Sequence, residues 1–325
     1  MSAQRRVALL VGAVAVAAVA VVGAVVLSSD GDSAGATATT TEPEIREGRP
    51  PLSFALGFRD DAQARDLTQG AALYQRGETE AAAARFAKHD SLEAKVGAAY
   101  AAWPEGTLDR LDQLAKLYPE VAVVQLHLGL ARLWANEGDP LEAWRAVVEA
   151  EPDTPYAIVA GNLLHPGLPR GLPAFIPSFT ASAAISKLPP ARQLEALRRA
   201  AVRGGVRERL LYGVGLQRVG RPVSAAREFD QAAQRFPNDV EAQVAGAVGA
   251  FDKDAPERAF GRLGPLSKSY PDEPSVRFHL GVLLLWTGRI EGAERQFKLA
   301  AKSQPTSPLA READRYLDTI RQARR

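Results

Sequence analysis

The chain has few side chains that could do chemistry, and their placement favours none of the usual reactions. Cysteine is absent, which excludes disulfides, thiolate metal sites and a cysteine nucleophile. Ser178 and Ser182 lack the surroundings of an activated serine, and no glycine-rich phosphate loop is present. No two of the histidines have metal-ligand spacing on one helix; they are His89, His127, His165 and His279. The sequence therefore predicts no enzyme, no cofactor and no metal site.

The remaining polar candidates have structural explanations. His127 precedes Gly129 by two residues and His279 precedes Gly281 by two, and this equivalent placement predicts a packing or surface role in a repeat. The paired acids at 60–61 and 252–254 fall beside expected helix ends, where carboxylates cap helices.

The composition indicates a folded, all-helical chain. Hydrophobic residues make up 46% of the 325 residues and charged residues 24%, which suits two domains or one elongated array. The net charge of +2 is too small for the basic field that nucleic acid requires, so we expect no nucleic-acid partner. Residues that favour strands are scattered among alanines without alternation, which favours helices.

Residues 7–27 form an apolar run without charge or proline. As a helix this run would extend ~31 Å, about the thickness of a bilayer's hydrocarbon core. Arg5 and Arg6 precede it, and basic residues stay on the cytoplasmic side. The sequence predicts a single-pass protein of the cytoplasmic membrane, with residues 1–6 inside and the C-terminal part outside.

A cleaved secretory signal peptide is the alternative for this run. Signal peptides have shorter apolar regions followed closely by a cleavage site, whereas the candidate site at 36–38 lies well beyond the run. Residues 28–50 are rich in Ser, Thr, Gly and acidic residues, a composition typical of a flexible spacer.

Six residue types recur at identical spacings in the C-terminal half of the chain. The two sets are displaced by 68 residues, from 213 to 281, which is twice 34. Small residues allow two helices to approach closely, large apolar residues fill the space between them, and proline ends the second helix. The sets are Gly213, Leu216, Ala225, Phe229, Ala232 and Pro237, then Gly281, Leu284, Ala293, Phe297, Ala300 and Pro305.

These residues and their period resemble the tetratricopeptide repeat (TPR), a helix–turn–helix unit of 34 residues, in a bacterial, membrane-anchored type. Weaker copies begin near Gly70, Gly97, Gly129 and Gly246. The resemblance implies an all-α TPR solenoid over residues 51–325, with about seven helix pairs. A last helix over 308–323 has the single apolar face that caps such an array.

Residues 165–190 interrupt the repeat with prolines, glycines and apolar side chains. The residues around them indicate a split repeat, with a first helix over 156–164 and a second over 192–202. In one interpretation Phe175, Ile176 and Phe179 fold back onto the solenoid. In the other the insert is a partner-binding element. The first is favoured, because loops that bury apolar residues usually pack locally.

The resemblance implies that the first helix of each pair lines a concave face that binds a protein or peptide. The candidate residues are aromatic, Arg and Gln side chains directed away from the paired helix; packing against the next repeat is the alternative for each. They are Trp134, Arg207, Gln217, Arg218, Gln243, Phe251 and Trp286.

The sequence therefore favours a membrane-anchored, extracytoplasmic scaffold or adaptor that binds proteins. An assembly factor or subunit of a secretion, pilus or cytochrome-assembly machine is the alternative. An enzyme with the insert as its lid is the third hypothesis.

Overall fold

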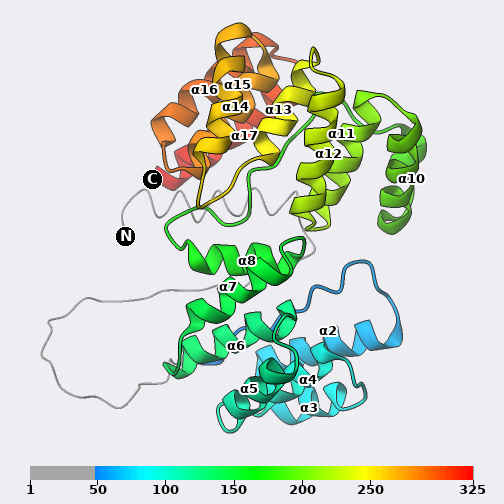
Figure 1. The fold of residues 1–325 in the computed structure, drawn as a ribbon, viewed down its shortest axis with the longest axis vertical. Helices are drawn as coiled ribbons and strands as arrows, with labels where there is room; N and C mark the ends of the chain where they lie inside the picture. The colour runs from blue at the N-terminus through cyan, green and yellow to red at the C-terminus, as the bar shows by residue number, and fades with distance from the viewer. Residues whose placement is uncertain (1–47, 325) are drawn as a thin grey trace, which may run out of the picture. The chain divides into compact units, whose positions relative to one another are not determined.

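The computed structural model describes residues 48–324, within which there are sixteen α-helices and no strand (Figure 1). The expected N-terminal segment 1–6, membrane helix 7–27 and most of the spacer 28–50 lie outside the described residues. No helix between residues 48 and 324 combines the length and the apolar character needed to cross a membrane. The prediction of an all-α repeat is confirmed for this part of the chain.

The chain divides into two compact units, whose described parts are residues 48–152 and residues 153–324. We call them the N-terminal unit and the C-terminal unit. The N-terminal unit contains three antiparallel helix pairs, α2/α3, α4/α5 and α6/α7, in which each pair packs on the next. The helices are α2 (Ala62–Arg76), α3 (Thr79–Phe86), α4 (Leu92–Ala101), α5 (Thr107–Leu117), α6 (Ala122–Ala135) and α7 (Pro140–Ala150).

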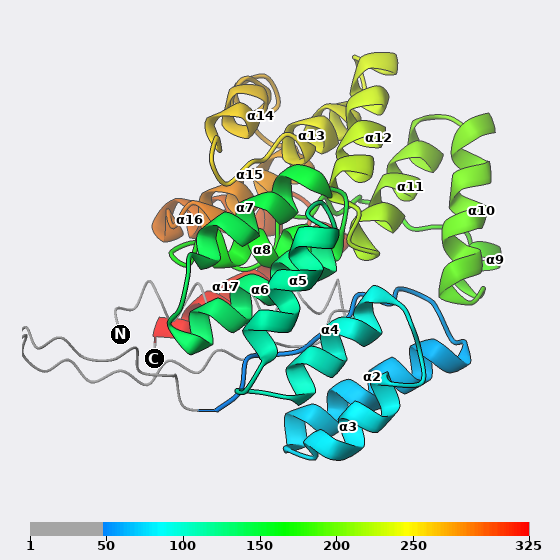
Figure 2. The ribbon, with the colours of Figure 1, turned by 60° about the horizontal axis from the view of Figure 1, so that its bottom comes forward.

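The C-terminal unit contains three more pairs, α11/α12, α13/α14 and α15/α16. At one end α10 packs on α11, and at the other α17 packs on α16 (Figure 2). The helices are α8 (Pro155–Leu164), α9 (Ala183–Ser186), α10 (Pro190–Arg203), α11 (Val206–Arg218), α12 (Pro222–Arg235), α13 (Val240–Gly249), α14 (Glu257–Ser269), α15 (Pro274–Trp286), α16 (Ile290–Ser303) and α17 (Pro308–Arg324).

The described residues hold six packed pairs, where the sequence predicts about seven. The expected split repeat does form two helices, α8 and α10, but these two do not pack together as a pair. The proline-rich coil between them leads the chain across the C-terminal unit, so that α10 meets α11 instead (Figure 1).

Small residues set the spacing within the pairs, as the sequence predicts. A Cβ atom at Gly213 would lie 2.3 Å from Cε1 of Phe229, and one at Gly281 would lie 2.7 Å from Cε1 of Phe297. The turn between α11 and α12 contains Gly220, whose φ of 71° is a left-handed conformation that glycine adopts without strain. These glycines therefore make the hairpins possible.

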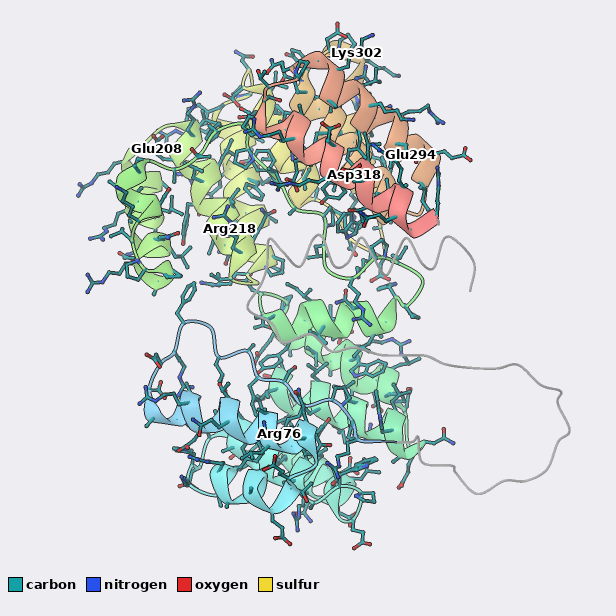
Figure 3. All side chains as sticks on the ribbon, turned by 180° about the vertical axis from the view of Figure 1, so that it is seen from behind. Arg76, Glu208, Arg218, Glu294, Lys302 and Asp318 are labelled. Atoms are coloured by element: carbon teal, nitrogen blue, oxygen red, sulfur yellow. The ribbon has the colours of Figure 1, made fainter. Side chains whose placement is uncertain are left out.

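The last helix covers the end of the C-terminal unit. Tyr316 stacks on Phe297 with ring centroids 5.0 Å apart, and it meets Phe278 edge-on at 5.7 Å. Glu294 of α16 binds Arg324 of α17 at 2.8 Å on the outer surface (Figure 3). The predicted apolar face is buried: Leu309, Ala313, Tyr316, Leu317 and Ile320.

Candidate functional site

An extended segment of the chain lies on the helices of each unit. We call residues 49–56 the N-terminal strap and residues 169–179 the C-terminal strap; neither has regular secondary structure. Leu52 and Phe175 are the buried anchors of the two straps, each 1% exposed. Arg49 and Pro50, which the sequence analysis assigns to the flexible spacer, belong to the N-terminal strap and contact Tyr74.

In the C-terminal unit, two helix side chains hold the peptide group that joins Phe175 to Ile176. Gln217 of α11 donates from Nε2 to the carbonyl oxygen of Phe175 at 3.1 Å. The N–H of Ile176 donates to Nε2 of His279 on α15 at 3.0 Å. Gln217 also accepts the N–H of Phe175 at Oε1, at 3.0 Å. One peptide group is thus bound on both sides, and we call this arrangement the peptide clamp.

The N-terminal unit contains the same peptide clamp on an unrelated sequence. Gln75 of α2 donates from Nε2 to the carbonyl oxygen of Leu52, and the N–H of Ser53 donates to Nε2 of His127 on α6, both at 3.4 Å. In each unit the glutamine comes from the first helix pair and the histidine from the third. Each unit therefore holds one strap peptide group between a glutamine and a histidine, although Gln75 follows Gly70 by five residues and Gln217 follows Gly213 by four.

The two histidines are held in the tautomer that can accept a backbone N–H. Nδ1 of His127 lies 2.6 Å from the carbonyl oxygen of Val123, and Nδ1 of His279 lies 2.7 Å from that of Ser275. Because a carbonyl oxygen only accepts, Nδ1 carries the hydrogen and Nε2 presents its lone pair to the strap. Burial lowers the pKa of each histidine from 6.5 to about 4, so both are neutral at pH 7.

An aromatic ring of each strap packs between the clamp histidine and a phenylalanine of the first helix pair. Phe175 lies 5.0 Å from the ring of His279, stacked, and 5.3 Å from the ring of Phe229. Phe54 lies 5.8 Å from His127 and 6.0 Å from Phe86. Phe86 and Phe229 occupy the same position of the repeat, so this contact is also common to both units.

Two more groups contact the end of the C-terminal strap. The N–H of Ser178 donates to Oε1 of Glu241 on α13 at 2.8 Å, and burial raises the pKa of this carboxyl. The guanidinium of Arg207 lies over the ring of Phe179, 5.0 Å from its centroid, a cation–π contact.

The start of the C-terminal strap is bound by a half-buried lysine. Nζ of Lys253 donates to the carbonyl oxygen of Pro169 at 3.1 Å and to Oδ1 of Asn162 at 2.8 Å. The same Oδ1 accepts the N–H of Gly171 at 2.8 Å. Burial lowers the pKa of Lys253 to about 8, yet the ammonium keeps two oxygen partners.

Of the concave-face candidates, the structure brings Arg207 and Gln217 to the C-terminal strap. Gln243 donates to the carbonyl oxygen of Ala233 at 2.7 Å instead, and Arg218 is exposed on α11 (Figure 3). Three aromatic candidates are buried: Trp134, Phe251 and Trp286.

Sequence reasoning did not assign His127, His279, Gln75 or Glu241 to this site. The equivalent placement of the two histidines was a usable signal, and it led to the expectation of a packing or surface role. Within residues 48–324, no group of three or more histidine or acidic side chains is arranged to hold a metal ion. The described arrangement is suited to binding peptide groups.

No protein-family model matches the chain, and no curated protein matches its sequence. Among solved structures, the chain is similar to YrrB, whose crystal structure is described as that of a TPR protein with an unusual peptide-binding site. The match covers 64% of this chain and 99% of that chain, with 14% sequence identity and a TM-score of 0.31. The helix-pair architecture described above therefore rests on the packing of this chain's own helices.

Proposed function

We propose that this chain is a protein-interaction scaffold whose helical units bind extended segments of other proteins. The observation that carries the proposal is the peptide clamp, which occurs in both units with a glutamine near the end of the first helix and a histidine at the same position of the third pair. Side chains that hydrogen-bond a peptide group on both sides recognise an extended backbone. That is the chemistry needed to bind a segment of a protein partner.

The packing of residues 165–190 also supports a scaffold over an enzyme. An enzyme with this insert as its lid requires an enclosed polar pocket under the insert. The structure instead places Phe175 there, packed against Phe229 and the neutral His279. We therefore propose a function without catalysis.

The proposal includes a place for the scaffold outside the cytoplasmic membrane, anchored by residues 7–27. The length of that apolar run and the position of Arg5 and Arg6 support it. The scaffold would then hold its protein partners close to the membrane surface.

Labelling of introduced cysteines tests this topology, because the natural chain has none. We expect Lys302→Cys, at an exposed position on α16 (Figure 3), to react in intact cells with a maleimide that cannot cross membranes. Ser2→Cys should react only after the cells are permeabilised. Labelling of Ser2→Cys in intact cells, with Lys302→Cys protected, would show the opposite orientation.

Affinity capture from detergent-solubilised membranes tests the scaffold function. The tagged full chain is compared with two neighbouring variants, Gln217→Ala in the peptide clamp and Arg218→Ala at an exposed position. We expect the recovered proteins to change in amount with the first variant and to stay the same with the second.

The composition of the recovered set separates the two remaining hypotheses. Many proteins indicate a scaffold, whereas one dedicated complex indicates an assembly factor. A set no larger than that recovered by a chain of residues 1–47 alone would refute both.

A further inference from the structure

We propose that the C-terminal strap is an internal ligand of the peptide clamp, and that an extended partner segment replaces it. The partner segment is uncharged at the clamp and carries a large apolar side chain at the position of Phe175. This inference rests on the proposed function and adds its regulation: the site is closed by the chain itself until a partner competes.

The first support is the way in which the strap is held. The carbonyl oxygen of Phe175 and the N–H groups of Ile176 and Ser178 bond to helix side chains. Among the described residues, no backbone–backbone hydrogen bond involves Gly171 to Ser178. Apart from the side chain of Ser178, which also hydrogen-bonds Glu241, the polar contacts at residues 175–178 come from peptide groups, which any extended segment can offer equally.

The second support is that the two clamps hold different sequences. In the N-terminal unit the clamped peptide group joins Leu52 to Ser53, and in the C-terminal unit it joins Phe175 to Ile176. Both anchors are buried, although one is aliphatic and the other aromatic. The site therefore requires an extended backbone and an apolar anchor rather than one fixed sequence.

The surroundings of the strap define the chemistry of the partner further. The rings of Phe229 and the neutral His279, which lie against the buried anchor, carry no charge, so they offer no partner to a charged side chain at this position. Glu241 is partly buried near Ser178 and disfavours an acidic residue at that point. Arg207 favours an aromatic ring at the position of Phe179.

Binding of a labelled strap peptide to the full-length chain tests the replacement directly. The probe is a fluorescent peptide of residues 169–180, and its anisotropy is measured with chain purified in detergent. Phe175→Ala in the chain removes the internal anchor without changing Gln217 or His279. We expect this variant to bind the peptide at least tenfold more tightly than the natural chain does.

Two matched controls place the binding at the clamp. The same peptide carrying Phe175→Asp should not bind the variant, because the charge would enter the apolar pocket. Adding His279→Gln to the Phe175→Ala chain should weaken peptide binding at least fivefold, while adding Arg218→Ala should leave it unchanged. Equal peptide binding by all these chains would overturn the proposal.

A second way to loosen the strap leaves its residues intact. No atom lies within 4 Å of a Cβ added at Gly167, so a protease site inserted after this residue should be accessible. Cutting it would release one end of the strap. We expect the cut chain to gain peptide binding as the Phe175→Ala variant does. Circular dichroism shows whether the Phe175→Ala chain and the cut chain stay folded. If they stay helical and neither gains peptide binding, the proposal is overturned. Loss of helix in both chains would also overturn it. Capture of partners by the natural chain would still support the scaffold function in that case.

Discussion

The acceptor role of His127 and His279 depends on their being neutral. Each presents Nε2 to a backbone N–H, and a proton on Nε2 would turn that hydrogen bond into a repulsion. Burial opposes the same proton, because a charged imidazolium would lose its hydration. Both effects keep the lone pair available at neutral pH.

The low pKa of the two histidines makes the stability of the units depend on pH. In the unfolded chain a histidine takes up a proton near pH 6.5, whereas in the folded chain it does so only at about pH 4. Between these values the unfolded state binds more protons, so the free energy of unfolding falls as the pH falls. The expected loss is roughly 3 kcal/mol for each histidine between pH 7 and pH 4. Urea unfolding midpoints at pH 7 and pH 4 measure it.

A matched variant isolates the histidine contribution. His279→Gln cannot titrate, so the difference between its midpoints at the two pH values should be smaller than that of the natural chain. Glu241 acts with the opposite sign, because its raised pKa favours the folded state as the pH falls, and it is present in both chains. An unchanged pH dependence in His279→Gln would refute the assignment of a low pKa to His279.

At the residue scale, the sequence predicted the position of a residue in the repeat better than it predicted which residues it contacts. The matched positions of His127 and His279 before Gly129 and Gly281 pointed to an equivalent role in the repeat. The partner of His279 is Ile176, which lies 103 positions away in the chain. No spacing of nearby residues indicates this contact, because the contact depends on the path of the coil that follows α8.

At the element scale, the close approach of paired helices explains the repeat glycines. Gly213→Ala would place a methyl group against Phe229, and the ring cannot move without disturbing the core. We expect a loss of roughly 1–3 kcal/mol in the free energy of unfolding, measured by urea titration.

Gly261→Ala on α14 is the control for this glycine, because nothing lies within 4 Å of the Cβ atom that it would add. Alanine favours a helix over glycine by about 1 kcal/mol, so this substitution should stabilise the unit. Destabilisation of equal size at both positions would show that packing against Phe229 is not the cause.

The elements themselves could be predicted largely from the sequence. The repeated Gly, Ala, Phe and Pro spacings placed the helix pairs of the C-terminal unit, because each spacing reflects contacts within one pair. The path of residues 165–181 could not be predicted in this way. Its hydrogen bonds to Gln217, Glu241 and His279 come from α11, α13 and α15, which belong to three different helix pairs.

At the scale of the whole molecule, residues 48–324 form two units that each contain three helix pairs and a strap. A stacked array leaves an apolar surface at its end unless a further helix covers it. In the C-terminal unit α17 provides that cover, and Tyr316 fills the space beside Phe278 and Phe297.

Removal of α17 tests this role. A chain that ends at residue 307 would expose the rings of Phe278 and Phe297 to water. We expect an unfolding midpoint lower by several degrees and increased binding of a hydrophobic dye. A chain that lacks only residues 324–325 loses the surface ion pair of Arg324 with Glu294 and should behave like the natural chain. Equal behaviour of the two truncations would refute the capping role.

The peptide clamp explains where the prolines of the two straps lie. Proline has no N–H to give, and its ring fixes φ close to the value of an extended chain. Pro51 lies just before the clamped group of one strap, and Pro173 and Pro177 flank that of the other, yet the donors are Ser53 and Ile176. The neighbouring prolines stiffen the segment before it binds, which lowers the entropy lost on ordering it. In each strap, the stiff prolines therefore occupy positions that donate no hydrogen bond to the clamp. The positions that do donate are occupied by residues with a backbone N–H.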